Sequence, residues 1–104
     1  MAGVPFHYPP EYLSIIHLGL GEVLLKQGDS SSALESYERA LEIRIRHADA
    51  DPTNAESQRE LAAIYQWIAV VYLAKADKPK AREAFESGRA RLARAIALSP
   101  DHKD

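Results

Sequence analysis

The stretch "LLKQGDSSSALESYERAL", residues 24–41, decides the fold, because one apolar helical pattern ends inside it and another begins. Gly28 can adopt a left-handed conformation without side-chain strain, which is typical of a residue that ends a helix. Asp29, or one of the serines after it, can accept hydrogen bonds from the free N–H groups of a following helix. We therefore expect two helices joined by a tight turn, the second folded back on the first.

The same pattern occurs again 48 residues later, where "YLAKADKPKAREAFESGR" spans residues 72–89. Gly28 and Asp29 correspond to Ala76 and Asp77. The correspondence extends to Leu20, Gly21, Leu24, Ala33, Tyr37 and Ala40, which match Ile68, Ala69, Tyr72, Ala81, Phe85 and Gly88 in that order. A helix, a short turn and a second helix therefore occur twice.

Four helices are predicted in all, over residues 11–26, 31–48, 53–75 and 78–98. Apolar residues of the first helix recur at steps of three and four, so we expect them to face the core. These residues are Leu13, Ile16, Leu20, Val23 and Leu24. Thr53 and Glu56 fit a capping box at the start of the third helix.

No segment alternates between polar and apolar residues for long, so no sheet is expected. A chain of 104 residues is typical of one domain. We place this all-α domain at residues 11–98. Its parts are an extended N-terminal segment (1–10), repeat one (11–50), repeat two (53–98) and a polar tail (99–104).

The two copies share a pattern of small and large residues. The first copy reads His17-x2-Leu20-Gly21-x2-Leu24 and then Ala33-x3-Tyr37-x2-Ala40. The second reads Tyr65-x2-Ile68-Ala69-x2-Tyr72 and then Ala81-x3-Phe85-x2-Gly88. This pattern resembles the tetratricopeptide repeat, although the family's usual period is about 34 residues and this one is 48. The long repeats of this chain look like those appended to multidomain bacterial signalling proteins.

The resemblance implies two antiparallel helix hairpins that form a fragment of a right-handed α-solenoid. In this family the small residues let paired helices approach closely, and larger ones fill the space beside them. The small positions are Gly21, Ala33, Ala40, Ala69, Ala81 and Gly88, and the larger ones are Leu20, Leu24, Tyr37, Tyr72 and Phe85.

The resemblance also implies a concave groove, lined by the first helix of each hairpin, that receives a partner peptide or helix. The matched positions are Ile15, Leu18, Gly19, Glu22 and Leu25 from the first copy, and Ala63, Gln66, Trp67, Val70 and Leu73 from the second. This lining is mostly apolar and lacks the Lys, Arg and Asn clamp that grips a C-terminal carboxylate in some relatives. Because tryptophan often dominates binding interfaces, Trp67 is the first candidate anchor.

The third helix is apolar on all sides, and such a helix is normally buried on all sides. Trp67, Val70, Val71 and Leu73 lie away from the face predicted to meet the fourth helix. A partner, a second copy of the chain or neighbouring repeats could cover them. The alternative is that the N-terminal segment, with Val4, Phe6 and Tyr8, folds back over the groove.

Other functions have little support in the sequence. No two of the four histidines are three or four residues apart and cysteine is absent, so we expect no metal site and no cofactor. Ser30, Ser31 and Ser32 fit a helix cap better than a nucleophile, and no phosphate-binding loop is present. Acidic residues interrupt the basic residues of the last helix, so we expect no nucleic-acid partner. We expect no enzyme, no membrane span and a cytoplasmic location.

The charge is uneven along the chain, with four Lys or Arg against eight Asp or Glu in residues 1–52 and nine against seven in residues 53–104. This difference fits either solvated helix faces or head-to-tail association of unlike ends. The sequence as a whole predicts a protein-interaction or assembly module with a protein or peptide partner. The alternative is a self-associating structural domain, a homodimer or a hairpin swap, whose groove is filled internally.

Overall fold

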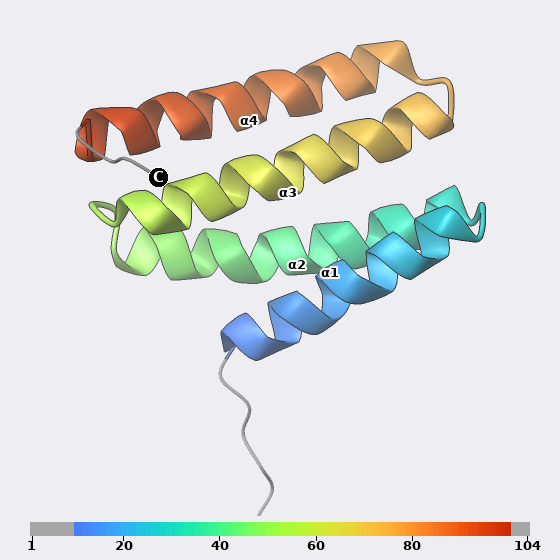
Figure 1. Cartoon of the computed structure of the whole chain (residues 1–104), viewed down its shortest axis with the longest axis horizontal. Coiled ribbons are helices and arrows are strands. Elements are labelled where there is room, and N and C mark those ends of the chain that lie inside the picture. The colour runs from blue at the N-terminus through green and yellow to red at the C-terminus, as the bar shows by residue number, and fades with distance from the viewer. Residues whose placement is uncertain (1–9, 101–104) are drawn as a thin grey trace, which may run out of the picture.

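The computed structural model describes residues 10–100, which form four helices and no strand (Figure 1). They are α1 (Pro10–Lys26), α2 (Ser30–Ala50), α3 (Ala55–Ala74) and α4 (Lys78–Leu98). Helix α2 packs against both α1 and α3, and α3 packs against α4. The prediction of an all-α fold built from two helix hairpins is therefore confirmed.

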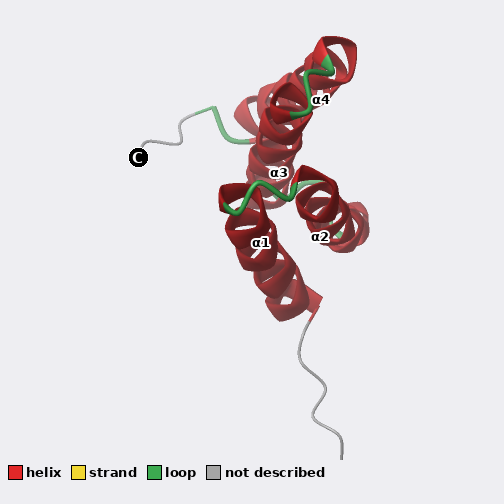
Figure 2. Cartoon of the chain, turned by 90° about the vertical axis from the view of Figure 1, so that its right-hand side faces the viewer, coloured by secondary structure: helices red, strands yellow, loops and turns green. Residues whose placement is uncertain are grey.

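The second hairpin stacks on the first through α2 and α3. In the view along the helices (Figure 2), α1 and α2 lie side by side below α3, and α4 lies above α3. The prediction that the N-terminal segment covers the groove rests on Val4, Phe6 and Tyr8, which lie outside the described range. Of the predicted extended segment (1–10) only Pro10 is described, and it belongs to α1, whereas only Ser99 and Pro100 of the predicted polar tail are described. The division into repeat units at 11–50 and 53–98 stays a prediction.

Both hairpin turns have the same hydrogen bonds, 48 residues apart. In the first turn, Asp29 N–H donates to the Leu24 carbonyl at 2.9 Å and Gly28 N–H to the Leu25 carbonyl at 3.0 Å. In the second, Asp77 N–H donates to the Tyr72 carbonyl at 2.8 Å and Ala76 N–H to the Leu73 carbonyl at 3.0 Å. This pair of bonds satisfies the last carbonyls of a helix when the residue after it is left-handed.

The left-handed residues are Gly28, with φ 84°, and Ala76, with φ 62°. The residue after each of them caps the next helix. Asp29 accepts from Ser32 N–H and Asp77 from Lys80 N–H, each at 3.2 Å. Each aspartate therefore caps the helix that follows it, as the sequence predicted, and its N–H also bonds to a carbonyl at the end of the helix before it.

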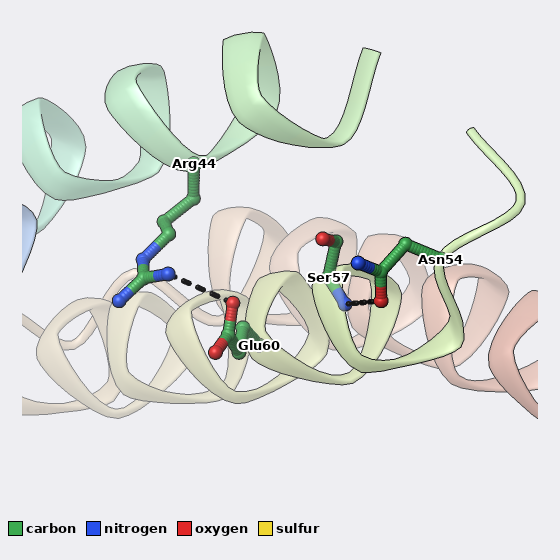
Figure 3. Close-up of polar contacts among 4 residues, drawn as sticks. All are labelled: Arg44, Asn54, Ser57 and Glu60. Carbon is green, nitrogen blue, oxygen red and sulfur yellow. Dashed lines mark hydrogen bonds and ion pairs between the residues drawn. The ribbon is translucent and has the colours of Figure 1, made fainter. Parts of the chain in front are cut away.

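The predicted capping box at the start of α3 is wrong. The N-cap is Asn54, whose side-chain oxygen accepts from Ser57 N–H at 3.2 Å (Figure 3). The Thr53 hydroxyl instead donates to the Asp51 carboxylate at 3.2 Å. The side chain of asparagine caps a helix at least as well as that of threonine, so α3 starts one residue later than a threonine cap would place it.

The core lies between the helices of each hairpin and between α2 and α3. All six small residues predicted at the close helix contacts are buried: Gly21, Ala33, Ala40, Ala69, Ala81 and Gly88. Space is tightest at Gly21, where an added Cβ would lie 2.9 Å from the ring of Tyr37. The small residues therefore set how closely the two helices of a hairpin approach.

The predicted inward stripe of α1 is largely wrong. Leu24 is half-buried against the core, but four other members of the stripe are exposed: Leu13, Ile16, Leu20 and Val23. Instead, Ser14 and Gly21 are buried on α1. Of the five larger residues expected to fill the core, Tyr37 is buried and Leu24 and Tyr72 are partly buried, but Leu20 and Phe85 are exposed.

Helix α3 is better covered than its sequence suggests. Val71, expected to need outside cover, is buried, together with Leu61, Ile64 and Ile68. This happens because α3 is packed between α2 and α4. The surface of α3 that stays open is the one that carries Trp67, which is 42% exposed.

Candidate partner-binding groove

A groove of about 370 Å³ lies between α1 and α3, with α2 beneath it. The wall from α1 consists of Ile15, Leu18, Gly19 and Glu22, and the wall from α3 consists of Glu60, Ala63, Ile64 and Trp67. Helix α2 contributes Tyr37 and Arg44 to the floor. The space is large enough for a few side chains of a partner, and most of its lining is apolar.

The indole of Trp67 is held against the floor of the groove. It stacks on the ring of Tyr37, with 6.0 Å between ring centroids and 10° between ring planes. Tyr37 is itself buried against Gly21, so its position is fixed by the first hairpin. A half-exposed indole on a rigid aromatic support is a surface that a partner can cover at little entropic cost.

An ion pair joins α2 to α3 beside the groove. Arg44 Nη1 lies 2.8 Å from Glu60 Oε1 (Figure 3), and the arginine side chain is mostly buried. Because the guanidinium is mostly buried, losing the carboxylate would leave a charge without a partner, which is costly. The pair therefore favours the observed placement of α3 on α2.

The buried hydroxyl of Tyr37 has no hydrogen-bond partner among the described residues. Burial raises the pKa of this phenol above 10.0, and the nearby carboxylate of Glu22 raises it further. Both effects disfavour the phenolate. The ring therefore contributes to the groove as a neutral aromatic surface.

The structure brings six of the ten predicted groove residues together: Ile15, Leu18, Gly19, Glu22, Ala63 and Trp67. Leu25 packs instead against the core, and Val70 is half-buried. Gln66 lines a separate hollow between α3 and α4, and Leu73 lies in another hollow between the same helices. The groove is therefore shorter along α3 than the sequence predicted.

Sequence reasoning missed the floor of the groove and the ion pair. Tyr37 was expected to pack only within its own hairpin, and Arg44 and Glu60 were not considered. A signal was present in the repeat: Arg44 corresponds to Leu92 and Glu60 to Tyr12, so each charged member of the pair is matched by an uncharged residue in the other copy. A polarity difference between copies marks a contact that one copy makes differently.

Residues 16–44, from α1 into α2, match the family model described as "Tetratricopeptide repeat". The chain contains a tetratricopeptide repeat. No curated protein and no solved structure matches the chain. Tetratricopeptide repeats are typically non-catalytic modules that bind other proteins, and the groove lies partly within the matched residues.

Two basic residues of the second hairpin make hydrogen bonds to other helices of the domain. Arg91 Nη1 donates to Gln58 Oε1 at 3.1 Å, and Lys75 Nζ donates to Ser31 Oγ at 2.9 Å. Among residues 10–100 no cluster of three His, Asp or Glu side chains could hold a metal ion. None of the four helices is long and apolar enough to cross a bilayer.

Proposed function

We propose that the domain binds a peptide or helix of a partner protein in the groove between α1 and α3. The observation that carries this proposal is the half-exposed indole of Trp67 on its Tyr37 support, inside a groove with apolar walls. Apolar residues of the partner would bury the indole, Ile15 and Leu18. The carboxylate of Glu22 would orient the partner by accepting from an N–H group or by pairing with a cation.

The partner's chemistry follows from this lining. An amphipathic helix with apolar residues at steps of three and four would place one stripe against Trp67 and the wall of α1. A basic residue at the edge of that stripe would meet Glu22, which is exposed and forms an ion pair with Lys26 at 3.5 Å. We therefore expect amphipathic, mildly basic segments to bind best.

The test is affinity for helical peptides selected from a displayed library on the wild-type chain. Trp67→Ala should weaken binding of the selected peptides about 30-fold, since an anchor residue contributes about 2 kcal/mol or more. Leu73→Ala is the matched control, because Leu73 is an equally exposed apolar residue of α3 that lies outside the groove. Equal peptide affinity of the Trp67→Ala variant and the wild type would show that the groove is not the binding site.

The alternative function, self-association that fills the groove internally, predicts a different result. Trp67→Ala would then change the mass of the chain in solution as well as peptide binding. Sedimentation of the variant and the wild type separates the two. The absence of enzymatic activity, the cytoplasmic location and the bacterial character of the repeats stay predictions from the sequence.

A further inference from the structure

Helix α1 has a second apolar face, separate from the groove, that no element of residues 10–100 covers. The 48-residue repeat shows what covers the same face in the second hairpin. On α1 the exposed fractions are 43% for Leu13, 58% for Ile16, 46% for Leu20 and 51% for Val23. At the matched positions on α3 they are 0% for Leu61, 2% for Ile64, 5% for Ile68 and 0% for Val71. The matched face of α3 is buried because α3 is packed between α2 and α4, while α1 packs closely only on α2.

Helix α4 has the complementary property. The residues of α2 that meet α3 include Tyr37, which stacks on Trp67, and Arg44, which pairs with Glu60. Their matches on α4 are Phe85 and Leu92, which are 40% and 45% exposed. Ala48, buried on α2, is matched by Ile96, which is 57% exposed. The surface of α4 is therefore equivalent to the surface of α2 that packs against α3, but no helix packs against it among the described residues.

The hollow between α3 and α4 supports this correspondence independently. It is lined by Ala63 and Gln66 from α3 and by Phe85 and Leu92 from α4, among others. Shifted back by 48 residues, these are Ile15, Leu18, Tyr37 and Arg44, all of which line the groove between α1 and α3. The hollow is the same groove one repeat further along, and it lacks the third helix that α3 supplies to the first.

We propose that this third helix is α1 of a second copy of the chain, docked on α4 in the register in which α3 packs on α2. One contact then covers the exposed face of α1 on one copy and that of α4 on the other. The contact is heterologous, which means that it uses different surfaces of the two copies. The copy that contributes α1 keeps its α4 face free, and the copy that contributes α4 keeps its α1 face free, so either can bind a further copy. The groove around Trp67 stays open.

The matched positions fit this arrangement sterically. Within the chain, the ring of Tyr37 on α2 stacks on the indole of Trp67 on α3. The matched residues are Phe85 on α4 and Gly19 on α1. In the proposed contact, the ring of Phe85 would therefore lie over a glycine, which has no side chain to clash with it. A Cβ added at Gly19 would meet nothing within 4 Å in the single chain, so this surface is open. The ion pair between Arg44 and Glu60 would be replaced by a contact between two uncharged side chains, Leu92 and Tyr12.

Charge also favours unlike ends. Helix α4 carries six Lys or Arg against two Glu, whereas residues 10–50 carry four Lys or Arg against seven Asp or Glu. Arg82 and Arg89 stand where α2 has Leu34 and Leu41, so their aliphatic stems would cover apolar surface while their charged ends face the acidic first hairpin. An α1-to-α1 contact would bring two acidic hairpins together and leave Phe85, Leu92 and Ile96 exposed.

The test uses two double variants of the full chain in sedimentation experiments over a range of concentrations. Ile16→Glu with Leu20→Glu removes the α1 face, and Leu92→Glu with Ile96→Glu removes the α4 face. All four side chains are exposed in the single chain, so helix content measured by circular dichroism should not change. Ala90→Glu with Ala97→Glu adds the same charge to exposed positions of α4 outside the face and serves as the control.

The wild type and the control should grow beyond a dimer as concentration rises, and each face variant alone should stay monomeric. An equimolar mixture of the two face variants should form a heterodimer that grows no further, because one intact face of each kind remains. A wild type that is monomeric throughout would overturn the proposal. So would a dimer that survives the α4 substitutions, since that would place the contact on α1 alone. Trp67→Ala should leave the assembly unchanged, which separates this test from that of the groove.

Discussion

At the scale of single residues, Tyr37 links the core to the groove. Its ring fits against Gly21 on one side and supports Trp67 on the other, while its hydroxyl is buried without a partner among the described residues. A buried hydroxyl without a hydrogen bond costs stability. The ring, rather than the hydroxyl, is therefore the part of Tyr37 that the fold uses.

Tyr37→Phe should consequently stabilise the fold by about 1 kcal/mol at neutral pH, because it removes the unpaired group and keeps the ring. The difference should widen above about pH 10, where the phenol ionises in the unfolded chain first, since burial raises its pKa in the folded state. The free energy of unfolding of the wild type therefore falls as pH rises through this range. The variant has no phenol at this position, so it does not show this part of the decrease.

Urea unfolding of both chains at about pH 8 and about pH 11 measures the two effects, and the other tyrosines and lysines cancel in the difference. A phenylalanine variant that is less stable at pH 8 would mean that the hydroxyl has a partner. A difference that stays constant with pH would contradict the raised pKa.

At the scale of helices and turns, the turns of the two hairpins differ in the residue that adopts the left-handed conformation, and this difference affects stability. Both turns need a left-handed residue, and glycine supplies it in the first turn whereas Ala76, with φ 62°, supplies it in the second. The left-handed conformation costs an L-residue with a Cβ about 1–2 kcal/mol. The second turn is therefore strained and the first is not.

Ala76→Gly should raise the free energy of unfolding by about 0.5–1 kcal/mol, because relief of the strain exceeds the extra chain entropy of glycine. The reciprocal Gly28→Ala should lower it by about 1 kcal/mol. No atom lies within 4 Å of a Cβ at Gly28, so that loss would be conformational rather than steric. Thermal and urea unfolding measure both, and a glycine variant no more stable than the wild type would contradict the strained turn.

The elements were largely predictable from the sequence, because turns and caps depend on residues close together in the chain. Gly28 and Asp29 define the first turn, and the 48-residue offset locates the second. The start of α3 was harder, since Thr53 and Asn54 are adjacent residues that can both cap a helix. The Arg44–Glu60 pair spans 16 residues and depends on how α2 crosses α3, which local patterns do not specify.

At the scale of the whole molecule, periodicity shows which face of a helix is apolar but not whether another helix covers it. Leu13, Ile16 and Leu20 have the same spacing as Leu61, Ile64 and Ile68, yet the first set is exposed and the second is buried. The difference comes only from the number of helices around each one. In a stacked-repeat fold, each hairpin contacts its neighbours and nothing else, so the ends of the stack keep uncovered faces.

Two kinds of surface follow from this architecture. The groove between α1 and α3 would receive a partner segment, and the outer faces of α1 and α4 would join copies end to end. The two surfaces share Gly19 of α1, but the substitutions that test each surface change residues that only that surface uses, so variants of one should not affect the other. A growing assembly would then present a series of grooves and bind a multivalent partner more tightly than a single copy does.

The most direct test of groove binding is the nuclear magnetic resonance spectrum of the isotope-labelled chain during titration with a selected helical peptide. Trp67 is the only tryptophan, so its indole N–H gives a single, unambiguous signal. If the peptide binds in the groove, this signal should shift together with the backbone amides of Leu18, Gly19 and Ala63. An indole signal that stays in place while the amides of α4 shift would contradict groove binding.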